Sequence, residues 1–199
     1  EGTLGTITAA KVKLEPIPTH IGLAVVHFAD LFKSMEATVM ILDHGPSAIE
    51  LVDKMILDRS KESLRFSNQQ SFIEGDPEAI LLVEFFGNDM KDVESKIDKM
   101  NQALQKNNLS YASIKALTPS QQKSAWALRA AGLGLLMSVK GDSKPLPFVE
   151  DTAVSPDKLP EYVRRFDSIV RSHNTTAGYY GHASVGCLHI RPMINIKTE

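Results

Sequence analysis

Apolar positions along the chain follow two periods in alternation, and this predicts a series of strands and helices. Residues 21–28 and 79–86 are β-rich apolar runs, which predict two buried strands. After each run, apolar residues recur at three- and four-residue spacing, which predicts helices that begin near Asp30 and Asp89. Residues 109–117 predict a further strand, and Thr118 with Pro119 then forms a helix start with proline at the first helical position.

Other segments are expected to complete this series. His44-Gly45-Pro46 ends the first helix, and Ser47 with Glu50 three residues later predicts a capping box for a second helix. Residues 9–14 and 148–153 predict short strands, and residues 156–173 predict an amphipathic helix that leads into a final hairpin. Because helices recur between strands that can pair antiparallel, we expect an α+β fold: a ferredoxin-like antiparallel sheet with helices packed on one face.

Two prolines near the start predict a boundary between structural units. Pro16 and Pro18 end the first predicted strand, because proline cannot donate to a strand ladder. We therefore expect residues 1–18 to belong to one domain and residues 19–199 to a second. The chain begins without an initiator methionine, inside an ordered-looking motif, so a preceding segment is also expected.

The densest group of reactive side chains lies in the final hairpin. The small residues 184–186 can reverse the chain between residues 177–183 and 187–194. A four-residue connection pairs His182 with Cys187 and leaves His189 diagonally placed on the same face, whereas a three-residue connection sends the two histidines to opposite faces. Only the first register, or a bulged equivalent, makes a metal-binding pair. Otherwise both histidines are ordinary strand residues.

Composition narrows the classes of function. The chain has 22 Lys and Arg against 24 Asp and Glu, for a net charge of -2, so it lacks the basic stripe of a nucleic-acid-binding protein. The longest apolar run, residues 79–86, contains Glu84 and is far shorter than the about 20 residues that cross a bilayer. With 1 cysteine and no cleavable signal pattern, we expect a cytoplasmic protein.

Three segments occur in an order that points to one family. The chain opens with Glu1-Gly2-Thr3-Leu4-Gly5-Thr6-Ile7, and Trp126-Ala127-Leu128-Arg129 lies near its middle. Glu150-Asp151-Thr152-Ala153-Val154-Ser155-Pro156 then precedes Tyr180-Gly181-His182 and Leu188-His189. This arrangement resembles the C-terminal domain of FAD-linked oxidases of the vanillyl-alcohol-oxidase type. Glycolate oxidase D-type subunits, D-lactate dehydrogenases and D-2-hydroxyglutarate dehydrogenases belong to that family.

The resemblance implies a function that this stretch alone would not perform. It would be the substrate-binding part of an FAD-dependent dehydrogenase that oxidises a 2-hydroxy acid to the 2-oxo acid. Residues Glu1, Gly2, Thr3, Leu4, Gly5, Thr6 and Ile7 would contact FAD, Arg129 and Lys144 would bind the substrate carboxylate, and His182 and His189 would bind a divalent metal, Zn²⁺ or a similar ion. The third metal ligand and the catalytic base are expected beyond Glu199, so no catalytic residue is assigned within the chain.

One departure from the family pattern bears on the electron acceptor. Ala-Ser-Val-Gly-Cys separates His182 from His189, which is similar to long bacterial relatives fused to an iron–sulfur module. The chain has no cysteine-rich cluster motif, so such a module would lie outside it or on a partner, and it would allow peripheral association with the membrane's inner face.

Each assignment has a simpler alternative. Arg129 and Lys144 could be a solvated helix arginine and a solvated loop lysine, residues 2–7 could be a plain turn, and Cys187 is expected to be a packed small side chain rather than a nucleophile. The rival function is a stand-alone ferredoxin-like binding or dimerisation module. Convergence of Arg129, Lys144 and the two histidines on one face would favour the enzyme.

Overall fold

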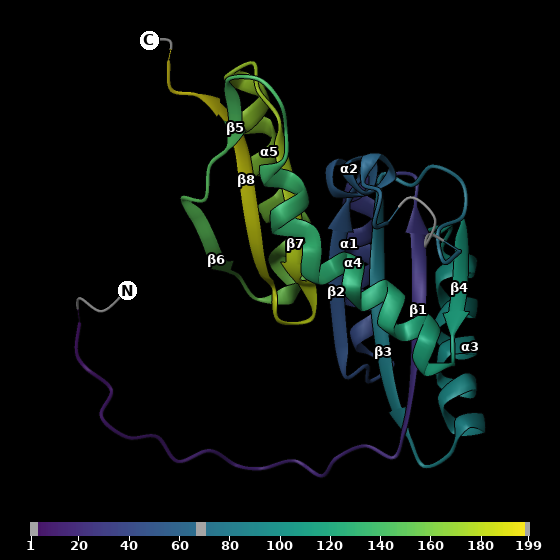
Figure 1. Cartoon of the computed structure of the whole chain (residues 1–199). Helices are drawn as coiled ribbons and strands as arrows, with labels where there is room; N and C mark the ends of the chain where they lie inside the picture. The colour runs from purple at the N-terminus through teal and green to yellow at the C-terminus, as the bar shows by residue number, and fades with distance from the viewer. Residues whose placement is uncertain (1–3, 67–70, 198–199) are drawn as a thin grey trace.

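A computed structural model describes residues 4–66 and 71–197 and confirms the α+β class. Within these residues, five α-helices accompany an eight-stranded sheet whose paired strands are all antiparallel (Figure 1). The elements in chain order are β1 (His20–Phe28), α1 (Leu31–Leu42), β2 (Ala48–Asp53), α2 (Lys54–Glu62), β3 (Ala79–Gly87), α3 (Met90–Lys106), β4 (Ala112–Ala116), α4 (Pro119–Met137), β5 (Ser143–Pro145), β6 (Val149–Ala153), η1 (Pro156–Lys158), α5 (Leu159–Ser172), β7 (Ala177–His182), η2 (Ala183–Val185) and β8 (Cys187–Asn195).

The sheet consists of a ferredoxin-like unit and an extension. The first four strands lie in the order β4-β1-β3-β2, with α1 and α3 as the connecting helices, which is the ferredoxin-like arrangement. β7 pairs with the free edge of β2, β8 pairs with β7, and both β5 and β6 pair with β8. The two parts of the sheet therefore meet along β2 and β7 (Figure 1).

Helices cover both faces of the sheet, whereas the sequence predicted helices on one face. Buried side chains of α1, α3 and α5 pack on one face, and those of α2 and α4 pack on the other. The reason lies in β1 and β3, which are apolar on both faces. In β1, for example, Ala24 and Val26 join the first cluster while Leu23 and Val25 join the second. A strand that is apolar on both sides must be covered on both sides.

Residues 48–53 form strand β2, so the prediction of a helix that begins at Ser47 is wrong. Ile49 and Leu51 pack in one core cluster and Val52 in the other, and β2 pairs with β3 on one side and β7 on the other. These strand pairings outweigh the short capping-box signal. The helix begins after Asp53 instead, whose Oδ1 accepts a hydrogen bond from the N–H of Ile56 at 3.2 Å.

The predicted strand over residues 9–14 is also absent. Residues 5–14 belong to no helix or strand, and Val12 and Leu14 are 72% and 84% exposed. A strand needs a partner for its backbone N–H and C=O groups, and the described part of the chain provides none here. This arm extends away from the start of β1 (Figure 1).

The hairpin has the register that brings the two histidines together. His182 pairs with Cys187 and Tyr180 with His189, so the connection is the four residues 183–186. Three of them form η2, and Gly186 closes the turn in the left-handed conformation with φ of 67°. Gly186 is required here because a Cβ would lie 2.0 Å from the carbonyl oxygen of Val154.

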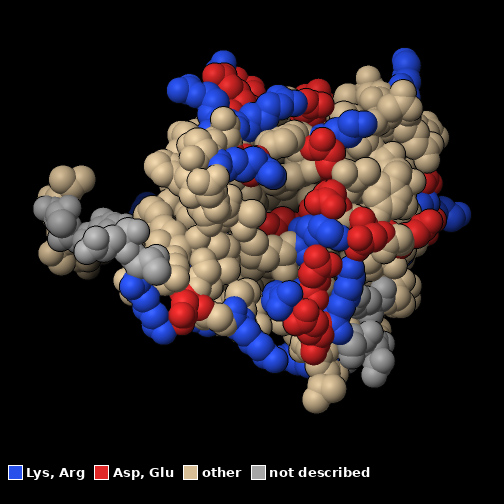
Figure 2. All heavy atoms as spheres, turned by 90° about the horizontal axis from the view of Figure 1, so that it is seen from above, with Lys and Arg blue, Asp and Glu red and all other residues tan. Residues whose placement is uncertain are grey.

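Charges are mixed on the face seen from above Figure 1. Figure 2 shows acidic and basic side chains interspersed there rather than a patch of one sign. Lys54 and Lys61, both on α2, lie 2.7 Å from the carboxylate oxygens of Asp76. Within the described residues, no helix is long and apolar enough to cross a membrane.

Candidate functional site

His182 and His189 lie side by side on the sheet face that α4 partly covers. Their ring centroids are 5.5 Å apart and the rings meet edge to face at 74°. The centroid of the Tyr180 ring lies 4.8 Å from that of His189, and Tyr180 belongs to the core cluster formed with α2 and α4. His182 is the more accessible of the pair, because its side chain is 47% exposed against 17% for His189.

Glu50 joins His182 to Arg129. It is the polar residue of an otherwise apolar stretch of β2, and it pairs directly with His182 on β7. Its Oε1 lies 2.7 Å from Nδ1 of His182, while its Oε2 accepts a hydrogen bond from Nε of Arg129 at 2.8 Å and forms an ion pair with Nη2 of Arg129, also at 2.8 Å. Arg129 reaches it from α4, and its guanidinium lies 5.2 Å from the centre of the Tyr180 ring.

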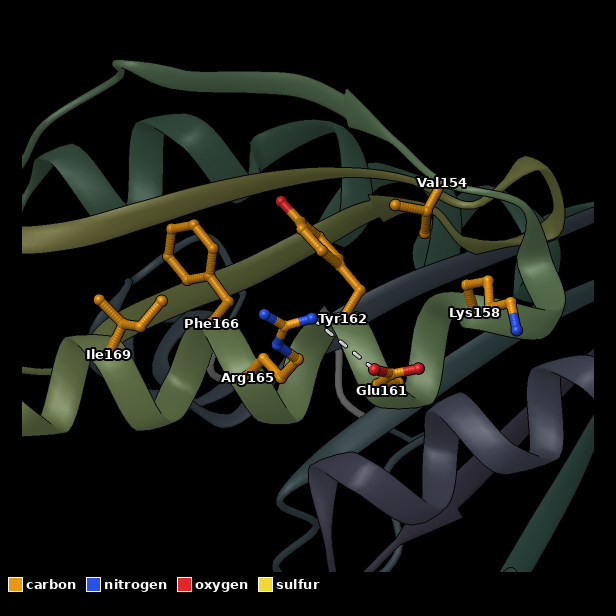
Figure 3. Close-up of a pocket in the computed structure, with 7 residues that line it drawn as sticks. All are labelled: Val154, Lys158, Glu161, Tyr162, Arg165, Phe166 and Ile169. Atoms are coloured by element: carbon orange, nitrogen blue, oxygen red, sulfur yellow. Dashed lines mark ion pairs between the residues drawn. The ribbon is translucent and has the colours of Figure 1, made fainter.

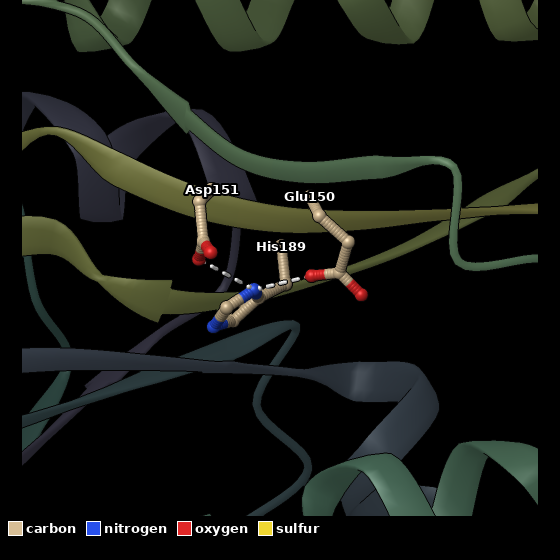
Figure 4. Close-up of side chains that lie close together, drawn as sticks. All are labelled: Glu150, Asp151 and His189. Carbon is tan, nitrogen blue, oxygen red and sulfur yellow. Dashed lines mark hydrogen bonds and ion pairs between the residues drawn. The ribbon is translucent and has the colours of Figure 1, made fainter. Parts of the chain in front are cut away.

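Two acidic residues of β6 meet His189. Nδ1 of His189 lies 2.8 Å from Oε2 of Glu150 and 3.4 Å from Oδ1 of Asp151. Figure 4 shows this nitrogen directed at the two carboxylates and the other ring nitrogen directed away from them. The pairing register of β6 with β8 shifts between Val149 and Thr152, and Asp151 has a positive φ of 48°, so a bulge lets both carboxylates approach the ring.

Arg191 is a buried cation beneath this group. Its side chain is 3% exposed, its Nη1 forms an ion pair with Oε1 of Glu150, and its Nη2 donates to the phenolic oxygen of Tyr180 at 2.9 Å. Because Arg191 lies two residues after His189 on β8, both side chains point to the same sheet face. A buried arginine must be paired to remain charged at an acceptable free-energy cost, and here Glu150 and Tyr180 provide the partners.

Of the residues predicted from the sequence, the structure brings Arg129, His182 and His189 together. Lys144 lies on β5, where its ammonium donates to the carbonyl of Val139 at 2.5 Å rather than to a member of this group. Cys187 is adjacent to His182, but burial and the nearby carboxylates of Asp151 and Glu50 raise the pKa of its thiol, so it is not an activated nucleophile.

The predicted FAD-contacting segment is only partly visible. Glu1, Gly2 and Thr3 lie outside the described residues. The segment from Leu4 to Ile7, with Gly5 and Thr6 between them, is exposed, at 102% for Leu4 and 89% for Ile7. This exposed apolar arm has no partner within the described chain.

Glu50, Glu150 and Arg191 were not predicted as site residues. Each had a detectable signal in the sequence, because a charged residue inside an apolar strand is rarely buried without a partner. Glu50 was instead assigned to a helix cap, and that error concealed its place beside His182.

A groove lies on the opposite face of the sheet from the histidine group. Figure 3 shows the side chains of α5 that line a groove of about 400 Å³, with Tyr162, Phe166 and Ile169 forming its apolar wall. Glu161 and Arg165 lie 3.7 Å apart at its rim. The groove contains none of the predicted site residues, so the histidine group is the candidate functional site.

Residues 17–199 match the family described as FAD linked oxidases, C-terminal domain. The chain belongs to this family. It is 31% identical to the D-2-hydroxyglutarate dehydrogenase of Pseudomonas putida over 99% of this chain and 20% of that protein. It is 28% identical to the D-lactate dehydrogenase of Anaerostipes hadrus over 100% of this chain and 42% of that protein, and 27% identical to glycolate oxidase subunit GlcD of Bacillus subtilis over 100% and 40%.

Solved structures confirm the fold of this C-terminal domain. An alkyldihydroxyacetonephosphate synthase superposes with a TM-score of 0.60 at 15% identity, over 92% of this chain and 38% of that one. A p-cresol methylhydroxylase superposes with a TM-score of 0.58 at 10% identity, over 92% and 40%. The chain spans between one fifth and about two fifths of the length of the relatives named above.

Proposed function

We propose that this chain is the substrate-binding part of an FAD-dependent dehydrogenase that oxidises a 2-hydroxy acid, such as glycolate, D-lactate or D-2-hydroxyglutarate, to the 2-oxo acid. The observation that carries the proposal is the convergence of Arg129, His182 and His189 on one sheet face in a member of this family. The three acids in the relatives' names share a carboxylate next to a carbon that bears a hydroxyl. Such a substrate needs a cation for one group and a polarising centre for the other.

Arg129 is suited to the carboxylate. Its Nε and Nη2 are engaged by Glu50, and Nη1 has no hydrogen-bond partner among the described residues, so this edge remains for a ligand. Arginine binds carboxylates through strong, charge-assisted hydrogen bonds. Lys144 would add a second cation, and to do so its ammonium would leave the carbonyl of Val139.

His182 and His189 are suited to a divalent metal such as Zn²⁺. Each uses Nδ1 to meet a carboxylate, which leaves Nε2 as the nitrogen for the metal, and metal-binding histidines usually have such a carboxylate partner. When bound, the ion would supply a Lewis acid for the substrate hydroxyl. Two imidazoles leave coordination positions open, so a further ligand and the catalytic base would come from outside this chain.

The exposed arm is proposed to meet FAD. Leu4, Gly5, Thr6 and Ile7, together with Glu1, Gly2 and Thr3, would continue a flavin-binding domain that ends near residue 18. A Cβ built at Gly5 has no heavy atom within 4 Å, so the backbone is open to close approach. The bound flavin would supply the hydride acceptor.

An iron–sulfur module, fused or on a partner, would take the electrons onward. The chain covers 20% of the D-2-hydroxyglutarate dehydrogenase but 42% of the D-lactate dehydrogenase, so the first relative is about twice as long and has room for another module. We propose a cytoplasmic protein that associates with the inner face of the membrane through its electron acceptor.

The test of the proposed activity uses this chain together with its flavin-binding domain. Mixing the anaerobic protein with glycolate, D-lactate or D-2-hydroxyglutarate should bleach the flavin absorbance with at least one of them. Arg129→Ala should lower kcat/KM roughly 10- to 150-fold, because a charged hydrogen bond contributes about 1.5–3 kcal/mol. Arg165→Ala, at a side chain 79% exposed, is the control. Flavin that stays oxidised with all three acids would contradict the proposal.

Metal binding is tested separately in the same protein, the chain together with its flavin-binding domain, by measuring its Zn²⁺ content after dialysis. The double substitution His182→Ala, His189→Ala should abolish stoichiometric Zn²⁺. His44→Ala, His173→Ala removes the same number of imidazoles elsewhere and should not. Equal Zn²⁺ content in the two double variants would refute the metal site.

A further inference from the structure

We propose that Glu50 and Glu150 are positioning residues, each anchored by an arginine, that fix His182 and His189 with the proton on Nδ1 and Nε2 free to bind a ligand. The inference deepens the proposed function, on which it rests for the identity of that ligand. It also gives roles to Glu50, Glu150 and Arg191, and a second role to Arg129.

We call each arginine–glutamate–histidine chain of contacts a relay. The first relay connects Arg129 on α4, Glu50 on β2 and His182 on β7. Arg129 holds Oε2 of Glu50 through a hydrogen bond from Nε and an ion pair with Nη2, both at 2.8 Å, and Oε1 of the same carboxylate lies 2.7 Å from Nδ1 of His182. A carboxylate without its proton accepts hydrogen bonds and cannot donate them, so the Nδ1 that faces it must carry the proton. The side chains of Arg129 and Glu50 are only 13% and 12% exposed, so water competes little for this geometry.

The second relay repeats this pattern with other residues. Arg191 pairs with Oε1 of Glu150, and Oε2 of that carboxylate meets Nδ1 of His189 at 2.8 Å. Both relays therefore have the order arginine, glutamate, histidine, with one carboxylate oxygen for each neighbour. Figure 4 shows the outcome for His189, whose second ring nitrogen is directed away from the carboxylates.

Tyr180 lies against both relays. The guanidinium carbons of Arg129 and Arg191 lie 5.2 Å and 5.7 Å from the centre of its ring, and its hydroxyl accepts from Arg191. Tyr180 is 4% exposed and packed in the core, so both arginines lie against a well-packed ring.

Stability alone is a poor explanation for these pairs. Desolvating an ion pair costs about as much free energy as its attraction returns, so apolar residues would serve the sheet equally well. Two histidines that each present Nε2, 5.5 Å apart by ring centroids, are what binding a shared ligand requires.

The experiment reads the position of the proton directly. Histidine-labelled protein of 199 residues is studied by long-range ¹H–¹⁵N NMR without metal, at a pH where both imidazoles are neutral. His182 and His189 should both show a protonated Nδ1 and an unprotonated Nε2. A neutral histidine side chain in water prefers the proton on Nε2, so this result would reveal the relays. Protonated Nε2 in either ring of the wild-type chain would overturn the proposal without any variant.

Variants then assign each relay. Glu50→Ala should change the tautomer of His182 and leave His189 as it is, and Glu150→Ala should do the reverse. Glu150→Gln should restore the wild-type pattern at His189, because its amide oxygen can still accept from Nδ1. Asp151→Ala is the matched control: this neighbouring carboxylate is farther from the ring, at 3.4 Å, and 72% exposed, so it should have little effect.

Metal binding gives an independent outcome. In the protein that includes the flavin-binding domain, Glu150→Ala should weaken Zn²⁺ affinity roughly 10- to 100-fold, as the loss of such an outer carboxylate does elsewhere. If both tautomers are as expected but Zn²⁺ does not bind, the relays stand and the proposed metal fails. If Zn²⁺ binds but the tautomers do not respond to Glu50→Ala and Glu150→Ala, the relays fail and the metal site stands.

Discussion

At the scale of single residues, Gly186 decides whether the two histidines share a face. It ends the four-residue connection with φ of 67°, and a Cβ would lie 2.0 Å from the carbonyl oxygen of Val154 and 3.1 Å from its carbonyl carbon. These atoms belong to the backbone and cannot rotate away. The hairpin register therefore depends on a residue without a side chain.

Gly186→Ala is expected to destabilise the fold by roughly 2–5 kcal/mol, because the left-handed backbone costs about 1–2 kcal/mol and overpacking about 1–3 kcal/mol. Urea unfolding followed by circular dichroism measures the change. Gly45→Ala is the matched control, since Gly45 has φ of 66° and an added Cβ would meet no atom within 4 Å. Gly45→Ala should therefore lower the free energy of unfolding only by the cost of the left-handed backbone, about 1–2 kcal/mol. Equal losses in the two variants would mean that the contact with Val154 is harmless.

The sequence identified the candidate site residues that the structure brings together, but not the side chains that contact them. His182, His189 and Arg129 were recognisable from motifs, and the register that unites the histidines was one of two that the spacing allowed. The partners Glu50, Glu150 and Arg191 depend on which strands are neighbours. Strand β2 lies beside β7, where Val52 pairs with Tyr180 from 128 positions later in the chain, and no local sequence pattern contains such a long-range contact.

At the scale of elements, the start of α2 shows why the helix predicted from Ser47 was wrong. Asp53 ends β2 and caps α2, and its Oδ2 also accepts a hydrogen bond from the N–H of Tyr179 on β7 at 2.7 Å. One carboxyl group thus joins a strand, a helix and the sheet extension. The strands with continuous apolar runs and the helices with clear caps, such as α3 after Asp89 and α4 after Thr118, were predicted correctly because their signals are local.

Burial of Asp53 makes the stability of the fold depend on pH. Burial raises the pKa of this carboxyl to about 7, although hydrogen bonds from the backbone of Tyr179 and Ile56 oppose the shift. In the unfolded chain the pKa of aspartate is about 3.9. Between these values the folded state holds a proton that the unfolded state has lost, so the free energy of unfolding contributed by Asp53 falls as pH rises from about 4 to about 7.

The expected slope from this one group is at most about 1.4 kcal/mol per pH unit. Urea unfolding of the wild type and Asp53→Asn at several pH values between 4 and 8 isolates it, because Asn does not titrate. The difference in unfolding free energy between the two proteins should shrink as pH rises. For Asp92→Asn, the difference in unfolding free energy from the wild type should change with pH in the opposite direction. The reason is that the N–H of Asn88 and the ammonium of Lys96 lower the pKa of Asp92. Parallel profiles for wild type and Asp53→Asn would contradict the prediction.

At the scale of the whole molecule, the first residues contribute little to the folded unit. Residues 5–14 are exposed and belong to no helix or strand, whereas residues 15–19 line a hollow together with Phe86 and Lys96 near the end of β3. The strand predicted within the arm was wrong, and the domain boundary predicted after residue 18 stays a prediction. Apolar character alone does not make a strand when no neighbouring edge is available.

Deletion of residues 1–14 is expected to change the free energy of unfolding by less than about 0.5 kcal/mol, as is usual for exposed positions without specific contacts. Thermal and urea unfolding of the shortened chain would measure this. Deletion of residues 1–19 removes the contacts near β3 as well and should cost more. A large loss on removing residues 1–14 alone would show that the arm packs on the domain in solution.

The seam between the ferredoxin-like unit and its extension has a thermodynamic consequence. β2 and β7 are joined through only three paired positions, and the contact of Glu50 with His182 crosses that seam. Both imidazoles belong to the extension, and Glu50 of the ferredoxin-like unit contacts one of them, so a ligand that depends on this contact would bind more tightly while the extension is docked and would suppress local opening there. Amide hydrogens of β7 and β8 should then exchange more slowly with solvent when the ligand is present, by at most about 100-fold with ligand at 100 times its Kd.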